Sequence, residues 1–250
     1  MKTVLSSLLL VVSFIFFCSP VTANSDQGKM SLVALGDSIP YGYNLGVNDN
    51  ASFSRNSYPF LIGKALDMRV RNLAVPGLQT EVMLYHLEND QKYRQAVRHA
   101  DYITLTIGSN DLLEALRIAS TKSLGDNDRF LKYLNKELEN TNLFENLSES
   151  VEEIRTLTDS PIIIYNVYNP YQKSNDLFLH NIGNEILPII NEEFRDLLDH
   201  YDNIDIADAH EAFGTNQEDY VIENDIHPTT EGQRILADVG IQVLNPYFED

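Results

Sequence analysis

The sequence has few basic residues. Lysine and arginine together number 18, against 37 aspartate and glutamate residues, so the formal net charge is -19. Binding to nucleic acid or to an anionic membrane depends on a basic surface, and this excess of acid therefore argues against both classes of partner. A neutral or zwitterionic substrate fits the charge better.

Several functional motifs are also absent. There is no glycine-rich phosphate loop, no dinucleotide fingerprint and no Gly-x-Ser-x-Gly elbow, which argues against nucleotide-dependent enzymes and ordinary α/β-hydrolases. Five of the six histidines show no metal-ligand spacing among themselves, so a zinc or iron site is not expected. These are His86, His99, His180, His200 and His210. We expect no cofactor and no metal.

The N-terminus has the pattern of an export signal. Lys2 is followed by an apolar run over Val4–Phe17 and by small residues ending at Ala23. We expect cleavage after Ala23 and secretion, which leaves one domain over residues 24–250 and no stable membrane insertion. The apolar run is short for a spanning helix, which usually needs about 20 residues.

Cysteine occurs once, at Cys18, inside the expected signal. After cleavage the chain would have no cysteine, and so no disulfide, thiol nucleophile or cysteine metal site. Phe17 is bulky where bacterial lipoprotein signals have a small residue, which disfavours lipidation of Cys18. That lipidation and a retained membrane anchor remain the alternatives to secretion.

Beyond the signal, short apolar runs alternate with segments of helical periodicity. The runs predict strands buried on both faces at Ser31–Leu35, Arg69–Ala74, Tyr102–Ile107, Ile162–Tyr168 and Ile204–Ala207. The periodic segments predict helices at Tyr58–Leu66, Thr80–Asn89, Asp111–Ala119, Asp128–Leu157, Asp176–Tyr201 and Thr229–Leu244. This alternation predicts a three-layer α/β/α fold with a central, mostly parallel sheet of about five strands and a site at the carboxyl ends of the strands.

Three short polar islands lie beside the ends of probable strands. They are Gly36–Ser38, Gly108–Asp111 and Asp225–Pro228. Together they supply a serine, a group of hydrogen-bond donors and a histidine, which are the parts of an acyl-transfer site. A serine hydroxyl needs a base to take its proton, and the tetrahedral intermediate needs donors for its oxyanion, so the three islands must converge in space.

Each of these residues also has a purely structural interpretation. Ser38 could cap the helix or turn after the first strand, and we expect Asp111 to cap the helix that begins at Leu112 while Asn110 faces the site. The polar stretch Tyr43–Asn56 is interpreted as a surface loop beside the first island, either a substrate rim or a solvated connection. The aromatic run Tyr165–Tyr171 could line a pocket, although packing at a strand end is favoured.

Taken in order, these islands resemble the sequence blocks of the SGNH hydrolase superfamily, also called GDSL esterases and lipases, from Leu32 to the final helix. The resemblance implies a flavodoxin-like fold and places Ser38 at the nucleophile, Gly77 in the second block, Asn110 in the third and His227 at the base. It further implies an oxyanion hole made of the N–H groups of Ser38 and Gly77 with the Asn110 side chain. The secreted lysophospholipase and thioesterase-like branch resembles the chain most.

One position departs from the family pattern. The family acid lies three residues before the histidine, and here that residue is Asn224, whereas Asp225 lies only two residues before His227. An anionic partner stabilises the imidazolium that forms during the reaction, and an amide cannot match it. Chemistry therefore favours Asp225 and the family spacing favours Asn224; we favour Asp225.

The sequence therefore predicts a secreted serine esterase or lipase acting on acyl esters, lysophospholipids or thioesters. Two alternatives remain open. One is an O-deacetylase of cell-wall polysaccharide, which a shallow, polar, open cleft would favour over an apolar acyl groove. The other is a non-catalytic binding module of the same fold, which Asn224 at the family acid position makes conceivable.

Overall fold

The computed structural model describes residues 28–46, 50–197 and 200–248, so the expected export signal lies outside the described residues. Five strands form one sheet in the order β2-β1-β3-β4-β5, and every neighbouring pair is parallel. The strands are β1 (Ser31–Gly36), β2 (Arg69–Asn72), β3 (Tyr102–Thr106), β4 (Ile162–Tyr165) and β5 (Ile204–Ala207). The predicted parallel sheet is confirmed.

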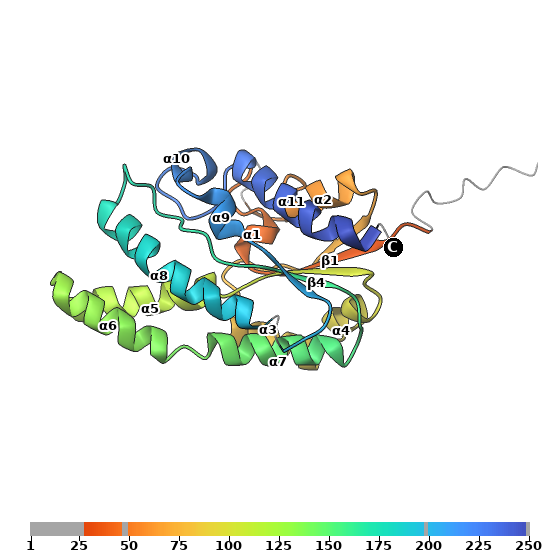
Figure 1. The fold of residues 1–250 in the computed structure, drawn as a ribbon, viewed down its shortest axis with the longest axis horizontal. Coiled ribbons are helices and arrows are strands. Elements are labelled where there is room, and N and C mark those ends of the chain that lie inside the picture. The colour runs from red at the N-terminus through yellow and green to blue at the C-terminus, as the bar shows by residue number, and fades with distance from the viewer. Residues whose placement is uncertain (1–27, 47–49, 198–199, 249–250) are drawn as a thin grey trace, which may run out of the picture.

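Helices cover both faces of this sheet (Figure 1). One face carries α2 (Tyr58–Ala65), α9 (Ala209–Phe213) and α11 (Thr230–Leu244), with the short α1 (Ser38–Tyr41) and α10 (Gln217–Tyr220) at its edge. The other face carries α3 (Thr80–Asn89), α4 (Gln91–Arg98), α7 (Leu143–Arg155) and the second half of α8 (Leu177–Asp196). The three-layer arrangement follows, because each face of the sheet is apolar and must be covered.

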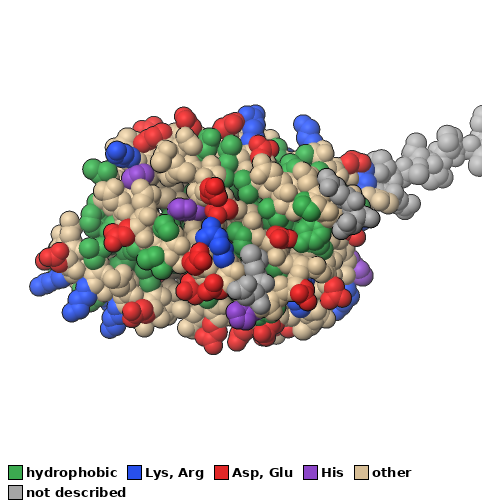
Figure 2. All heavy atoms as spheres, in the orientation of Figure 1, with side chains coloured by type: hydrophobic (Ala, Val, Ile, Leu, Met, Phe, Trp, Pro, Cys, Tyr) green, Lys and Arg blue, Asp and Glu red, His purple; other side chains and the backbone are tan. Residues whose placement is uncertain are grey.

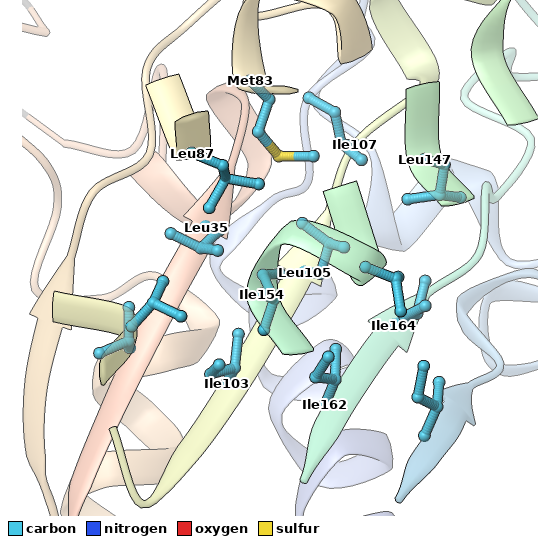
Figure 3. Close-up of a cluster of buried hydrophobic side chains, with 14 of the residues drawn as sticks. Leu35, Met83, Leu87, Ile103, Leu105, Ile107, Leu147, Ile154, Ile162 and Ile164 are labelled. Carbon is cyan, nitrogen blue, oxygen red and sulfur yellow. The ribbon is translucent and has the colours of Figure 1, made fainter. Parts of the chain in front are cut away.

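β1, β3 and β4 bury alternate residues on opposite faces, whereas the edge strand β2 is partly exposed, so its prediction as a strand buried on both faces is wrong. Ile162 and Ile164 of β4 pack in the cluster shown in Figure 3, together with Leu105 of β3 and Leu147 of α7. Ile163 points the other way, into the second cluster beneath α2 and α11. Apolar residues at every position of the strand are therefore required, which is why the run has no polar alternation.

β4 ends three residues earlier than predicted, at Tyr165. The side chain of Asn191 in α8 accepts a hydrogen bond from the Val167 N–H at 3.0 Å and donates one to the Val167 carbonyl at 2.9 Å. Val167 is thus bound by a side chain instead of a neighbouring strand. The aromatic run that follows passes over the carboxyl end of the sheet.

The long helical segment predicted at Asp128–Leu157 is two helices. α6 (Asn127–Glu139) ends at Asn140, and α7 begins at Leu143. The Thr141 hydroxyl donates to the Leu138 carbonyl at 2.9 Å, a local bond that competes with the helical pattern. No proline or glycine occurs at this break, so a prediction from hydrophobic periodicity treated the two helices as one.

Helices α5 (Ser109–Ser123), α6 and the first half of α8 project beyond the carboxyl edge of the sheet (Figure 1). They share a small apolar cluster of their own, built around Ala115, Phe130, Leu134 and Ile182. This three-helix projection therefore packs partly on itself, beside the site described below.

Acidic side chains outnumber basic ones over the face drawn in Figure 2, as the net charge of -19 requires. Among the residues that the structure describes, we find no helix with both the length and the apolar character to cross a membrane.

Candidate active site

The first two islands meet where the strand order reverses. β1 and β3 are neighbours, while β2 lies on the far side of β1 and β4 on the far side of β3. Ligands of open α/β sheets bind at such a switch point, at the carboxyl ends of the strands. Ser38 follows β1 there, and Asn110 lies in the first turn of α5 after β3.

Gly36 allows the close approach of these two segments. Its φ angle is 141°, and a Cβ atom at this position would lie 2.0 Å from the Thr106 carbonyl oxygen. The next residue, Asp37, donates its N–H to that same oxygen at 3.2 Å. Asp37 then caps α1 by accepting from the Ile39 N–H at 2.9 Å. Capping therefore falls to Asp37, and the Ser38 hydroxyl is left for other contacts.

Ser38, His227 and Asp225 form a continuous hydrogen-bonded line. The Ser38 Oγ lies 2.9 Å from His227 Nε2, and His227 Nδ1 lies 2.6 Å from Asp225 Oδ1. The serine is 8 % exposed, and the histidine and aspartate side chains are 12 % and 19 % exposed. A base within hydrogen-bond reach of a hydroxyl, itself oriented by a carboxylate, is the arrangement that activates a serine.

The turn before His227 determines which acid candidate reaches the ring. Asn224 has a left-handed φ of 57° and an exposed side chain. The Asp225 N–H donates to the Ile222 carbonyl at 3.0 Å, and the Ile222 N–H donates to the His227 carbonyl at 2.9 Å. This tight turn directs Asp225 to the imidazole, so the structure pairs His227 with Asp225 and not with Asn224.

The environment of Asp225 favours its charged form. Burial raises the pKa of the Asp225 carboxyl, but a hydrogen bond from Asn44, another from the Ile226 N–H and the charge of His227 outweigh it and hold the pKa below its ordinary value. The carboxylate is therefore ionised wherever neutral imidazole could act as a base.

Of the predicted oxyanion donors, Asn110 lines the same cavity as Ser38, and Gly77 precedes Leu78, whose carbonyl Asn110 contacts. Within the described residues, neither the Ser38 N–H nor the Gly77 N–H has a hydrogen-bond acceptor in the protein. Gly77 has a φ of 78°, consistent with a turn. The Asn110 amide donates to the Leu78 carbonyl at 2.9 Å and lies 3.4 Å from Asp37 Oδ2. Their role toward a substrate oxyanion stays a prediction.

The expected cap of α5 by Asp111 is wrong. α5 begins at Ser109 after Gly108 and has no side-chain cap. Instead, Asp111 accepts from both the N–H and the hydroxyl of Thr80, at 3.2 Å and 2.7 Å, and so caps the start of α3. Sequence patterns locate caps within one helix, and this contact joins two helices that are far apart in the chain.

Asp37 is fully buried next to the nucleophile, and its burial has an electrostatic consequence. Burial raises the pKa of the Asp37 carboxyl from 3.8 to about 7, aided by the negative charge of Asp111 and opposed by the Ile39 N–H. The folded protein therefore holds a proton at Asp37 under conditions in which the unfolded chain has released it.

We expect Asp37→Asn to change the pH dependence of stability. Because the pKa of Asp37 is higher in the folded protein, its protonation contributes to the stability of the fold. This contribution is fully present below about pH 3.8 and is lost as the pH rises through about 7. The full change corresponds to about 4 kcal/mol. Melting temperatures of wild type and Asp37→Asn should therefore diverge in favour of the variant between these pH values. A difference that stays constant with pH would show that Asp37 does not titrate there.

An apolar groove extends from the serine into the three-helix projection. Ser38, Asn110 and His227 line one part of it, and its apolar walls include Leu113 and Leu116 of α5, Leu134 and Leu138 of α6, and Ile182 and Ile186 of α8. The groove has a volume of about 90 Å³, counted as the space that the centres of water molecules could occupy. Since one water needs on the order of 10–15 Å³ on this measure, the groove has room for a chain of several carbon atoms.

The aromatic run Tyr165–Tyr171 has both of the uses considered for it. Tyr168 and Tyr171 line the groove. Tyr165 is buried and packs on Tyr58, with ring centroids 4.4 Å apart. Tyr168 also donates its hydroxyl to the Ile226 carbonyl at 2.8 Å, which steadies the segment that carries His227.

Two residues of the Tyr43–Asn56 loop lie against the site. The sequence indicated the loop as a whole but not these two residues. The ring of Tyr43 lies 4.9 Å from the ring of His227, and Asn44 contacts Asp225. Part of this loop, residues 47–49, lies outside the described residues.

Across the described ranges, no group of three or more His, Cys, Asp or Glu side chains could hold a metal ion.

The chain is similar to known proteins over most of its length. The model of the GDSL-like lipase/acylhydrolase family matches residues 34–235. The spore germination lipase LipC of Bacillus licheniformis is 24% identical over 213 residues, which are 84% of this chain and 93% of that protein.

Solved structures share the fold. The lipase Lip_vut3 from a goat rumen metagenome superposes with a TM-score of 0.66 at 24% identity, covering 86% of this chain and 97% of that one. A phospholipase A1 from Streptomyces albidoflavus gives a TM-score of 0.64 at 19% identity, covering 86% of this chain and 99% of that one.

Proposed function

Since the chain belongs to the GDSL-like lipase/acylhydrolase family and is an ester-acting hydrolase, we propose that it cleaves esters of medium-chain or long-chain fatty acids, with lysophospholipids or similar lipids as substrates. The observation that carries this proposal is the apolar groove that joins Ser38 and His227 to the walls of α5, α6 and α8. Such a groove excludes water and suits an acyl chain, and the net charge of -19 favours neutral or zwitterionic esters.

The site supports a two-step mechanism. Ser38 Oγ attacks the ester carbonyl while His227 Nε2, 2.9 Å away, takes the hydroxyl proton. The Ser38 and Gly77 N–H groups and the Asn110 amide stabilise the oxyanion, and His227 returns the proton to the departing alcohol. Water then attacks the acyl-enzyme as the same histidine takes its proton, and His227 passes that proton to Ser38 Oγ as the acyl–oxygen bond breaks, which releases the fatty acid and restores the serine hydroxyl. His227 carries out every proton transfer in these two steps.

We expect Leu116→Phe to shorten the acyl chain that the enzyme accepts. Leu116 lies six residues after Asn110 on α5, which is about 9 Å along the helix axis, and a larger side chain there would block the groove. With p-nitrophenyl esters, kcat/KM for the decanoate should fall about tenfold or more while that for the acetate stays the same.

A matched control is Leu131→Phe on α6, where the same change falls on a residue that is 37 % exposed. It should leave both esters unchanged. A wild-type preference for acetate over decanoate, or equal losses on both esters in Leu116→Phe, would overturn the acyl-groove assignment. In that case the O-deacetylase alternative, tested with acetylated glycans, becomes the better one.

We also propose that the protein is exported. The support is the sequence pattern from Lys2 to Ala23, which precedes the described residues. Protein recovered from the culture medium should begin at Asn24, as read by N-terminal sequencing. An intact N-terminus, or a lipid on Cys18, would contradict this.

A further inference from the structure

Asp225 has further partners besides the His227 ring, namely the adjacent Ile226 N–H, which donates to Oδ1 at 2.6 Å, and Asn44. The same Oδ1 lies 2.6 Å from His227 Nδ1, while the other carboxylate oxygen, Oδ2, accepts a hydrogen bond from the Asn44 amide at 2.5 Å. Asn44 is 181 residues away in the chain. Because a carboxylate is a rigid plane with both oxygens on one carbon, a bond that holds one oxygen also restricts the direction of the other.

Asn44 is itself held in place. Its N–H donates to Asn50 Oδ1 at 2.7 Å, and its side-chain oxygen accepts from the Asn50 amide at 2.8 Å. The Tyr41 hydroxyl donates to the Asn50 carbonyl at 2.9 Å. Since the oxygen of the Asn44 amide is occupied by Asn50, its NH₂ group faces Asp225.

The backbone of this segment is consistent with a positioned side chain. Asn44 and Asn50 both have left-handed φ angles, 59° and 56°, and asparagine is one of the few residues with a side chain that adopts this conformation readily. The preceding residue, Tyr43, contacts the ring of His227. Residues 43 and 44 therefore contact the base and the acid together.

We propose that Asn44 is a positioning residue of the catalytic site, which fixes the Asp225 carboxylate against His227 and compensates for an acid only two residues before the histidine. This inference rests on the proposed esterase function. Oδ1 of Asp225 accepts from the adjacent Ile226 N–H as well as contacting His227, and the Asn44 bond to Oδ2 is the contact from a distant segment that restrains the rotation of the carboxylate. Asn44 also donates to the charged form of Asp225, which lowers the pKa of that carboxyl.

The test removes the Asn44 side chain without straining the backbone. Asn44→Gly suits the left-handed φ, and Asn203→Gly is the matched control, because Asn203 has a φ of 56° at the opposite end of the sheet. On a p-nitrophenyl ester, Asn44→Gly should lower kcat about tenfold to a hundredfold with little change in KM. Asn203→Gly should keep wild-type values.

A double-mutant cycle separates positioning from general destabilisation. If Asn44 acts through Asp225, Asn44→Gly should lower kcat no further in an Asp225→Ala background. An equal additional loss there, or a wild-type kcat in Asn44→Gly alone, would overturn the proposal.

Asn44→Asp provides a second variant if the glycine variant does not fold. It places two carboxylates together, so its activity relative to wild type should fall as the pH rises and both become charged. The other titratable groups beside this pair are His227, Tyr43 and Tyr168. The negative charges of Asp37 and Asp225 add to burial in raising the pKa of Tyr168. A ratio independent of pH would contradict the proposal.

A readout without substrate keeps this inference separate from the proposed function. The proton on His227 Nδ1, observed by NMR through its hydrogen bond to Asp225, should shift or disappear in Asn44→Gly and persist in Asn203→Gly. If the wild type cleaves no ester, the function fails while this measurement still decides the role of Asn44. An unchanged resonance in Asn44→Gly overturns it.

Discussion

Replacing Ser38 with alanine should lower ester hydrolysis by at least about a thousandfold. The Ser38 hydroxyl bonds to His227 Nε2 and is the only hydroxyl in the described residues that does so. Without it no acyl-enzyme can form, and only the residual effect of the oxyanion donors remains. The measurement is kcat on a p-nitrophenyl ester, together with labelling by a fluorophosphonate probe, which should be abolished.

The fold should be unaffected by this change. Asp37, not Ser38, caps α1, and among the described residues the one side-chain bond lost is that to His227. Ser123→Ala is a suitable control, since Ser123 is also a buried serine and its hydroxyl, within the part of the chain that the structure describes, bonds to the Ser120 carbonyl alone, at the far end of α5. Its activity should match wild type. Ser38→Ala with near wild-type turnover would mean that another group is the nucleophile.

The sheet could be predicted because its signal is local. β1, β3 and β4 are buried on both faces, so their residues are mostly apolar or β-branched, and the polar islands follow directly after β1 and β3. The serine, histidine and aspartate could be predicted for the same reason. Each lies in a short motif beside a strand end or the final helix, and sheet topology brings such ends together.

The groove and the role of Asn44 depend on contacts between distant segments. Leu116, Leu134 and Ile182 read as ordinary core residues of three separate helices, and only their packing leaves a channel between them. Asn44 lies in a polar loop of ordinary composition, and nothing within that loop indicates a partner 181 residues away. The burial of Asp37 is similarly invisible locally, because a short aspartate after a strand usually lies in solvent.

The choice between Asp225 and Asn224 gives the second large effect. Asp225→Ala should lower kcat by about a thousandfold to ten-thousandfold, because His227 loses the group that fixes its tautomer and stabilises its charged form. Asn224→Gly should stay within about twofold of wild type, since the Asn224 side chain is exposed and glycine suits its φ of 57°. The measurement is kcat for both variants under the same conditions.

A third variant tests whether the family spacing can be restored. Asn224→Asp combined with Asp225→Ala places the carboxylate three residues before His227, but the turn held by the Ile222 and His227 backbone bonds directs residue 224 away from the ring. This double variant should therefore remain as inactive as Asp225→Ala. Recovery of activity in it, or a heavy loss in Asn224→Gly, would mean that the turn rearranges in solution and that position 224 supplies the orienting group. The 2.6 Å contact between Asp225 and His227 predicts the opposite result, with the acid carried at the shorter spacing and supported from the other side by Asn44.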